Sequence, residues 1–341
     1  MCLLFFLFCS RGVSELQDFY VFSNGQLKRQ DNTIYFIDGE GKKKSLPVDK
    51  VENLHLFGET QFNSSFLNLL NQYDINLHIY NYYGFYAGSY VPREKKVSGF
   101  VLVKQAEHYL KEEKRLDIAR SFIESASFHI LRNLKSHKEK TSDTIRMITE
   151  ERKKLENANS VQEIMGIEGR IRNCYYQSFS QFLRPEFSME KREKRPPTSP
   201  INALLSFGNS LMYTTVLTEI YKTQLNPTIS YLHEPSVKRF SLSLDIAEIF
   251  KPLIVEPLIF SLINNRRITP KQFSYEHGFC LLNEEGRKRF IESWEKKMQT
   301  SIKHRKLKRQ VTYRYLIRLE CYKLIKHVIG DEKYKPLKAW W

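Results

Sequence analysis

Between residues 18 and 98, hydrophobic and polar positions alternate in short runs. The segment FYVFSNGQLKRQDNTIYFIDGEGKKKSLP contains several such runs, separated by SNG, DN and DGEG. These are turn sequences of the kind that join antiparallel strands. Further strand-like runs follow in VENLHLFG and INLHIYNYYGFYAGSYVP, and the apolar residues between Phe62 and Leu70 have a helical spacing. Short strands with frequent turns predict a small β-sandwich.

The hydrophobic period changes after PREKKVSG at 92–99, a polar segment with proline and glycine that is typical of a domain boundary. From 100 to about 134, apolar residues recur with helical spacing, and a second helix is expected near 142–156. A third begins after Ser160, an N-cap residue with Glu163 as its capping-box partner. The proline-rich loop RPEFSMEKREKRPPTSP precedes further helices that continue to the C-terminus.

These patterns predict an α+β protein, with a small N-terminal β-sandwich domain at 18–98 and a larger all-α domain at 99–341. Residues 1–17 do not fit either pattern. The segment MCLLFFLFCS is apolar, but it is too short to span a bilayer, and neither a preceding basic residue nor a clear cleavage site marks it as a signal peptide. It is either a short buried segment or the product of a misassigned gene start. We favour the second interpretation, which the intact mass of the native protein would test.

Composition narrows the class of partner. The 341 residues include 54 Lys and Arg against 38 Asp and Glu, a net charge of +16. Such a protein attracts polyanions, of which nucleic acid is the commonest and acidic lipid the alternative. The five cysteines are odd in number and form no CxxC pair, which argues against a disulfide scaffold or zinc ribbon and fits the reducing cytoplasm. The chain has no Walker loop, GxGxxG, GxSxG or HExxH motif.

Candidate chemistry lies in YLHEPSVKRFSLSLDIAEIFKP at 231–252, where His233, Glu234, Asp245 and Glu248 stand in a largely apolar frame. Asp245 and Glu248 have i, i+3 spacing, so both project from one face of a helix. A carboxylate among packed apolar groups is unfavourable unless it is paired, protonated or bound to a cation. The pattern therefore has two interpretations: a divalent-metal site, or an amphipathic helix with a solvated acidic edge.

A further carboxylate, Glu168, is flanked by Gly166 and Gly169 inside the third helix. Glycines in a helix interior are destabilising, so we expect another helix or a phosphate strand to approach the backbone closely here. Glu168, His233 and Glu248 would make an O, N, O ligand set for Mg²⁺ or Mn²⁺. Such an ion polarises a phosphoryl oxygen, and Lys251 could neutralise the phosphate. Spacing alone leaves both interpretations open and does not identify the substrate.

A basic run, KHRKLKR at 303–309, is the other charged feature. Its cationic side chains either follow a phosphate backbone or form only a solvated face; they are Lys303, Arg305, Lys306, Lys308 and Arg309. In contrast, His277 in EHGFC is interpreted as a loop residue rather than a ligand.

Several ordered pieces of the chain resemble one known family. They are YVFSNGQLKRQDNTIYF, EGRIRNCYY, SPINALLSFGNSLMY, NPTISYLHEP, LSLDIAEIFKP and the closing YKPLKAWW. From about Phe19 to Trp341 the sequence resembles the CRISPR-associated integrase, which inserts new spacers into CRISPR arrays. NYYGFYAGSYVPRE and LVKQAEHYL are similar to its I-B-like branch. Residues 1–17 lie outside the resemblance.

The resemblance implies a β-sandwich N-terminal domain for dimerisation and partner contact, followed by a helical catalytic domain. It implies that Glu168, His233 and Glu248 bind the metal, that Asp245 supports or ligates, and that Lys251 is a basic residue of the site. Asn202 matches a further family position near the site.

The implied reaction is metal-dependent transesterification, in which the 3′-hydroxyl of a spacer precursor attacks a phosphodiester at the border of the CRISPR repeat. Endonuclease activity is expected from the same site. The implied partners are DNA, a second copy of the chain in a homodimer, and a small second CRISPR-associated acquisition protein that bridges two dimers. No membrane partner is expected. The rival interpretations are a catalytically silent DNA-binding scaffold and a general branched-DNA repair nuclease without a CRISPR role.

Overall fold

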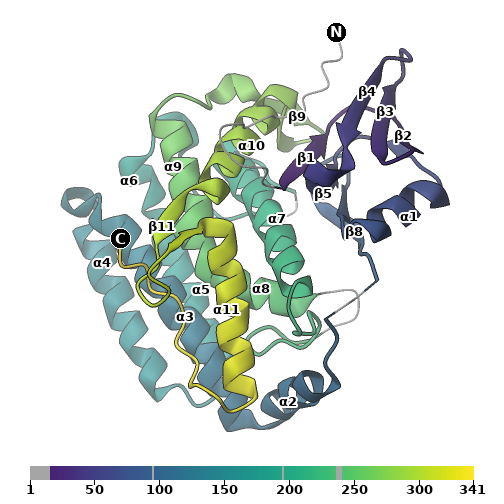
Figure 1. Cartoon of the computed structure of the whole chain (residues 1–341). Helices are drawn as coiled ribbons and strands as arrows, with labels where there is room; N and C mark the ends of the chain where they lie inside the picture. The colour runs from purple at the N-terminus through teal and green to yellow at the C-terminus, as the bar shows by residue number, and fades with distance from the viewer. Residues whose placement is uncertain (1–15, 94–95, 194–195, 236–239) are drawn as a thin grey trace. The chain divides into compact units, whose positions relative to one another are not determined.

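The computed structural model describes residues 16–93, 96–193, 196–235 and 240–341. The apolar segment MCLLFFLFCS therefore lies outside the described residues. The chain divides into two compact units, Met1–Lys95 and Lys96–Trp341 (Figure 1), and the division falls within the polar segment at 92–99. The first unit is mostly strand and the second mostly helix, which confirms the predicted α+β class.

The N-terminal unit is built from two four-stranded sheets. The first has the order β1 (Gln17–Val21), β5 (Val51–Leu56), β7 (Asn76–Tyr80) and β8 (Tyr86–Tyr90). The second has the order β4 (Lys43–Pro47), β3 (Thr33–Asp38), β2 (Gly25–Gln30) and β6 (Thr60–Gln61). Side chains from both sheets and from helix α1 (Ser64–Gln72) form one hydrophobic core. Phe66, Leu69 and Leu70 are buried in it, as their helical spacing predicts.

The strand pairing confirms two of the three predicted turns. DN joins β2 to β3 and DGEG joins β3 to β4, each in an antiparallel hairpin. The prediction for SNG is wrong, because β1 pairs with β5 in parallel and β2 belongs to the other sheet. β5 also pairs with β7 in parallel. Parallel strands are buried on both faces, and the almost continuously buried β1 and β5 fit this rule.

The C-terminal unit is a helical body with two small hairpins. Its longer helices are α2 (Gly99–Leu110), α3 (Glu112–Lys135), α4 (Lys138–Lys153), α5 (Val161–Gln177), α7 (Pro200–Tyr221), α8 (Ser241–Phe250), α9 (Glu256–Asn264), α10 (Glu284–Gln299) and α11 (Tyr313–Val328). α3 packs against α4, α5 and α8, while α7 packs against α8 and α11 (Figure 1). α8 is buried nearly all round, as a helix at the centre of a domain should be.

Three expectations for this unit need correction. The helix predicted from 100 to about 134 is interrupted at Lys111, between α2 and α3. The unit is not entirely helical, because β9 (Phe273–Glu276) pairs with β10 (Phe279–Leu282), and β11 (Ser301–Lys303) pairs with β12 (Gln310–Thr312). Strands of three or four residues are too short to establish a period in the sequence. The capping box at Ser160 is partial: Glu163 N–H donates to Ser160 Oγ at 3.1 Å, but the Glu163 carboxylate accepts from Asn159 N–H at 2.8 Å.

The described part of the chain contains no helix that is both long and apolar enough to cross a bilayer. The three described cysteines, Cys174, Cys280 and Cys321, are not in disulfides. His277 lies in the β9–β10 turn with a positive φ of 50°, which confirms that it is a loop residue.

The glycines of the helical unit differ in the space around them. A Cβ at Gly208 of α7 would lie 2.6 Å from Val255 Cγ1 and 2.9 Å from Phe290 Cζ. A Cβ at Gly169 would meet no described atom within 4 Å, and one at Gly166 would meet only the end of Arg170 at 3.4 Å. The expected close approach of another helix at Gly166 and Gly169 is therefore wrong for the described residues. Gly208 is the position where α7 packs closely.

This difference predicts opposite effects of alanine on stability. Gly208→Ala should lower the free energy of unfolding by about 1–3 kcal/mol, because overpacking outweighs the better helix propensity of alanine. Gly169→Ala should leave it unchanged or raise it by up to about 1 kcal/mol. Urea unfolding followed by circular dichroism compares the two variants, and equal destabilisation would contradict the packing described here.

Candidate active site

The two carboxylates of α8 are buried. Asp245 is 0% exposed and Glu248 is 6% exposed. A solvated acidic edge would leave both in water, so that interpretation of the i, i+3 pair is wrong. Buried carboxylates need partners, and the contacts of these two define the site.

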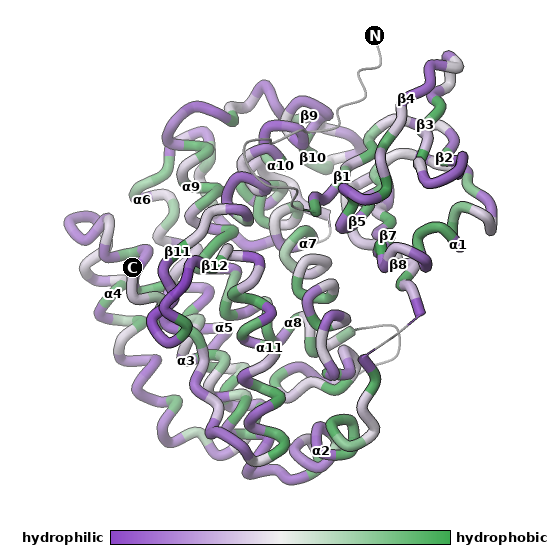
Figure 2. The backbone as a smooth tube through the Cα atoms, in the orientation of Figure 1, coloured by the Kyte–Doolittle hydropathy of each residue, from purple (hydrophilic) through white to green (hydrophobic). Residues whose placement is uncertain are grey.

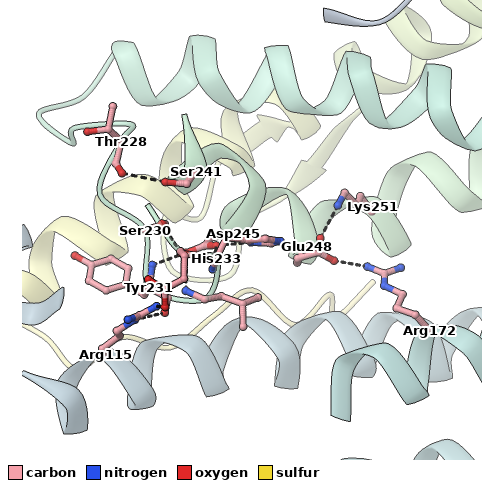
Figure 3. Close-up of polar contacts among 12 residues, drawn as sticks. Arg115, Arg172, Thr228, Ser230, Tyr231, His233, Ser241, Asp245, Glu248 and Lys251 are labelled. Atoms are coloured by element: carbon pink, nitrogen blue, oxygen red, sulfur yellow. Dashed lines mark hydrogen bonds and ion pairs between the residues drawn. The ribbon is translucent and has the colours of Figure 1, made fainter. Parts of the chain in front are cut away.

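Asp245 binds the loop that carries His233 (Figure 3). Its Oδ2 accepts hydrogen bonds from the backbone N–H groups of Tyr231 at 2.6 Å and Leu232 at 2.9 Å. Its Oδ1 accepts from the backbone N–H of His233 at 2.9 Å and pairs with His233 Nδ1 at 2.7 Å. One carboxylate thus fixes three consecutive residues and the imidazole ring. Asp245 is a positioning residue in this arrangement.

Other contacts brace the same loop (Figure 3). Ser230 Oγ donates to the His233 carbonyl at 2.6 Å, and Ser241 Oγ donates to the Thr228 carbonyl at 2.9 Å. Arg115 Nε, on α3, donates to the Tyr231 carbonyl at 2.9 Å. The loop is therefore tied to both α8 and α3, although it has no regular secondary structure.

The contact with Asp245 determines the state of His233. A carboxylate can only accept, so Nδ1 carries the proton, and in the neutral ring Nε2 presents the lone pair. Burial acts to lower the pKa of His233, but the hydrogen bond and charge of Asp245 and the charge of Glu248 outweigh it, and the pKa is raised. An imidazole held by a carboxylate through one nitrogen is the usual arrangement of a metal-binding histidine.

Glu248 lies between two cations (Figure 3). Its Oε2 accepts from Arg172 Nη2 at 2.7 Å and its Oε1 accepts from Lys251 Nζ at 2.5 Å. Burial acts to raise the pKa of Glu248, but the charges of Lys251, Arg172 and His233 lower it below its ordinary value. Glu248 is therefore ionised at neutral pH. Lys251 begins the π-helical turn Lys251–Val255, a distortion that is frequent at functional sites.

Arg172 connects the predicted residues that lie far apart in the sequence. Its Nε donates to Glu168 Oε1 at 3.3 Å, one turn earlier on α5. Its Nη2 binds Glu248 on α8, and its Nη1 donates to Glu256 Oε1 on α9 at 2.7 Å. The charge of Glu248 acts on His233 in turn. Glu168, His233 and Glu248 are thus brought into one electrostatic group, with Lys251 beside it.

The donor set fits a divalent cation in its chemistry, since it offers two carboxylates and an imidazole nitrogen whose tautomer is fixed. In the arrangement described here, however, no three His, Cys, Asp or Glu side chains among the described residues are placed as ligands of a single ion. Both oxygens of Glu248 face cations instead. An ion that binds Glu248 must therefore share its oxygens with Arg172 and Lys251 or displace one of them.

Two residues that the sequence places near the carboxylate group have other partners. Asn202, buried near the start of α7, holds the preceding loop: its Oδ1 accepts from Arg192 Nη1 at 3.0 Å and its Nδ2 donates to the Lys191 carbonyl at 2.9 Å. It is a positioning residue for that loop. Glu234 forms an ion pair with Arg115 at 2.6 Å, and 58% of its side chain is exposed.

The basic run forms the β11–β12 hairpin, which Figure 2 shows as a hydrophilic stretch between α10 and α11. Its five predicted DNA-binding cations are all exposed; they are Lys303, Arg305, Lys306, Lys308 and Arg309. Arg305 lies over the Trp340 ring at 5.4 Å and Arg309 over the Tyr315 ring at 5.5 Å. The hairpin is a solvated cationic surface, and it follows the carboxylate group in the sequence by about fifty residues.

Sequence reasoning missed Arg172 and Glu256. Arg172 follows Glu168 by four residues, so it lies on the same helical face, and this spacing could have identified it. Glu256 follows Glu248 by eight residues across the π-turn, and nothing in the local sequence indicates that a single arginine joins them.

Comparison with known proteins now decides the family. Residues 19–296 match the family described as CRISPR associated protein Cas1. The chain belongs to the Cas1 family. The CRISPR-associated endonuclease Cas1 of Clostridium perfringens is 58% identical over 328 residues, which are 95% of this chain and 99% of that protein. A Cas1 endonuclease of Thermodesulfovibrio yellowstonii is 54% identical over 96% of this chain and 100% of that protein.

Solved structures agree with this assignment. A Cas1 protein from Thermotoga maritima has 41% sequence identity and a TM-score of 0.83, over 93% of this chain and 99% of that one. A casposase bound to integration product has the same fold at 19% identity, with a TM-score of 0.81. Membership of the Cas1 family places the chain among CRISPR-associated endonucleases and explains the resemblance of its sequence pieces.

Proposed function

We propose that this Cas1 protein is a divalent-metal-dependent endonuclease and integrase of CRISPR adaptation, which inserts spacer DNA by transesterification. The observation that carries the proposal is the Asp245–His233 pair beside an ionised, buried Glu248. The proposal assigns Glu168, His233 Nε2 and Glu248 as ligands of Mg²⁺ or Mn²⁺. When bound, the ion would polarise a phosphoryl oxygen and favour the deprotonated form of the attacking 3′-hydroxyl.

The chain's own residues prepare the site. Asp245 keeps the His233 ring in the tautomer whose Nε2 can ligate. Lys251 Nζ, which pairs with Glu248, can turn to the negative charge that develops on the oxygens of the reacting phosphate. The mechanism needs no covalent bond between protein and DNA. Positioning and charge neutralisation supply the catalysis.

The proposed partners follow from charge and from the relatives. A net charge of +16 suits a protein that holds a donor duplex and its target. A structural neighbour with 18% identity is part of a Cas6-RT-Cas1–Cas2 complex. For this chain we propose DNA, a homodimer and the small second CRISPR-associated acquisition protein, acting in the cytoplasm.

The proposal is tested by incubating a 3′-hydroxyl duplex with a supercoiled plasmid that carries the CRISPR repeat, with Mg²⁺ or Mn²⁺ and the partner protein. Metal-dependent joining at the repeat border is expected, and Glu168→Gln should abolish it. DNA binding without joining would favour the silent scaffold, and cleavage of branched DNA without joining would favour a repair nuclease.

The exposed β11–β12 hairpin provides a separate prediction about DNA affinity. Replacing Lys306 and Lys308 with Gln should weaken binding and reduce the slope of log K against log salt by about 1 for each phosphate that these lysines neutralise. The same change at the exposed Lys138 and Lys140 of α4 is the matched control. Filter binding across a salt series measures both, and an unchanged slope in the hairpin variant would remove the hairpin from the DNA interface.

A further inference from the structure

Arg172 is a buried cation, with 8% of its side chain exposed, that contacts three carboxylates at once. The partners come from three helices: Glu168 at 3.3 Å on α5, Glu248 at 2.7 Å on α8 and Glu256 at 2.7 Å on α9. Two of these carboxylates are assigned above as metal ligands. The third, Glu256, has no role in the proposed reaction.

Glu256 is 1% exposed, and its two oxygens differ. Oε1 accepts from Arg172 Nη1. Oε2 is buried and has no donor with good hydrogen-bond geometry among the described residues; its nearest donor is the Tyr175 hydroxyl. Burial raises the pKa of Glu256, while the charge of Arg172 and the Tyr175 hydroxyl oppose this rise. A buried carboxylate oxygen normally has a hydrogen-bond donor, so an oxygen in this state needs an explanation. The lone pairs of Oε2 allow Glu256 to accept a second N–H donor from a guanidinium.

Entry of a metal ion creates the need for such an acceptor. Lys251 and Arg172 each contact one oxygen of Glu248, so an ion that binds Glu248 comes close to both cations, and charge repulsion favours movement of one of them. Lys251 is the more exposed of the two, at 17% of its side chain, and can turn toward solvent or substrate. Arg172 is buried, and its Nη2 would be left without an acceptor. The guanidinium fork suits a carboxylate that can accept two parallel hydrogen bonds.

We propose that Arg172 is a positioning residue that holds Glu168 and Glu248 together before the metal ion binds, and that Glu256 receives its guanidinium when the ion takes Glu248. This inference rests on the proposed metal site. Arg172 acts as an internal counterion, which offsets the repulsion between the buried Glu248 and the partly buried Glu168. Glu256 keeps this cation from competing with the ion.

Two single variants have opposite expected effects, measured as Mn²⁺ affinity by calorimetry and as the melting temperature with and without Mn²⁺. Glu256→Gln keeps the shape of the side chain but leaves Arg172 on Glu248, so Mn²⁺ should bind about tenfold more weakly. Arg172→Met should bind Mn²⁺ at least as tightly as the wild type. Its melting temperature should fall in chelator and recover with Mn²⁺, because a ligand stabilises the state that it binds.

The double variant separates an effect through Arg172 from a simple removal of negative charge. If Glu256 acts through Arg172, Glu256→Gln has no further effect on Mn²⁺ affinity in the Arg172→Met background. A tenfold weakening that persists in that background would overturn the proposal. If Arg172→Met fails to fold, Arg172→Lys replaces it in the same comparison of single and double variants. The single nitrogen of a lysine cannot contact both carboxylates and then move its bond from Glu248 to Glu256 as a guanidinium can.

Glu219→Gln is the matched control. Glu219 is a buried carboxylate on α7 that binds Arg318 Nε at 2.7 Å and Lys222 Nζ at 3.1 Å, with none of the site residues involved. This variant should have a melting temperature that is lowered equally with and without Mn²⁺, and it should keep its Mn²⁺ affinity. If Glu256→Gln keeps the Mn²⁺ affinity of the wild type, the inference about Arg172 and Glu256 is wrong, but the proposed function is not affected. A wild type that binds no Mn²⁺ would contradict the proposed function as well.

Discussion

His233→Ala is expected to reduce strand transfer about a thousandfold, the rate equivalent of losing roughly 4 kcal/mol of transition-state stabilisation. The substitution removes the imidazole whose Nδ1 is held by Asp245 at 2.7 Å and whose Nε2 is proposed to ligate the metal. Asp245 retains the backbone N–H groups of Tyr231 and Leu232, so the loop should keep its conformation. Quantifying plasmid integration products by gel electrophoresis measures the reduction.

DNA binding by the same variant should be largely unchanged, because affinity comes mainly from exposed cations. His277→Asn is the matched control: His277 lies in the β9–β10 turn, and Asn tolerates its positive φ. The control should integrate like the wild type. Near-wild-type integration by His233→Ala at saturating metal would show that His233 is not part of the reaction centre.

Asp245→Asn is expected to weaken Mn²⁺ binding about 10- to 100-fold, the usual cost of changing the partner of a metal-binding histidine. Asp245 uses both oxygens as acceptors, one for Tyr231 and Leu232 and the other for His233. An asparagine has one oxygen and one NH₂ group. The NH₂ group must therefore face either the N–H donors of Tyr231 and Leu232 or those of His233. The ring is then no longer held in one orientation, and buried backbone donors are left without an acceptor.

The same substitution should lower the free energy of unfolding by about 1–3 kcal/mol, the cost of unsatisfied buried polar groups. Calorimetric Mn²⁺ titration and urea unfolding measure the two effects together. A variant that is less stable but binds Mn²⁺ like the wild type would show that Asp245 supports only the fold. Glu219→Gln provides the comparison, since it also disturbs a buried carboxylate.

The sequence predicted those parts of the fold that depend on local pattern. The DN and DGEG hairpins, the helix at 64–72 and the helical period of the C-terminal unit are all set by neighbouring residues. The parallel pairing of β1 with β5 is not, because it depends on strands separated by an intervening second sheet. Turn residues such as SNG signal a change of direction but do not determine which strand pairs with which.

In the candidate site, too, local spacing predicts some features and tertiary packing determines the others. The spacing of Asp245 and Glu248 placed them on one helical face, but it could not distinguish a buried face from a solvated edge. Burial of α8 by α3 and α7 decides this, and that packing is a property of the whole unit. The bridge from Arg172 to Glu256 joins residues 84 positions apart, so no local spacing rule could predict it.

The central claim is that His233 and the carboxylates Glu168 and Glu248 hold one divalent ion. Electron spin echo envelope modulation of Mn²⁺ bound to the protein tests it most directly, because it detects a nitrogen nucleus in the coordination sphere. The modulation of a single imidazole nitrogen is expected in the wild type, and it should disappear in His233→Ala. Bound Mn²⁺ without nitrogen modulation, or modulation that persists in His233→Ala, would show that His233 is not a ligand of the ion.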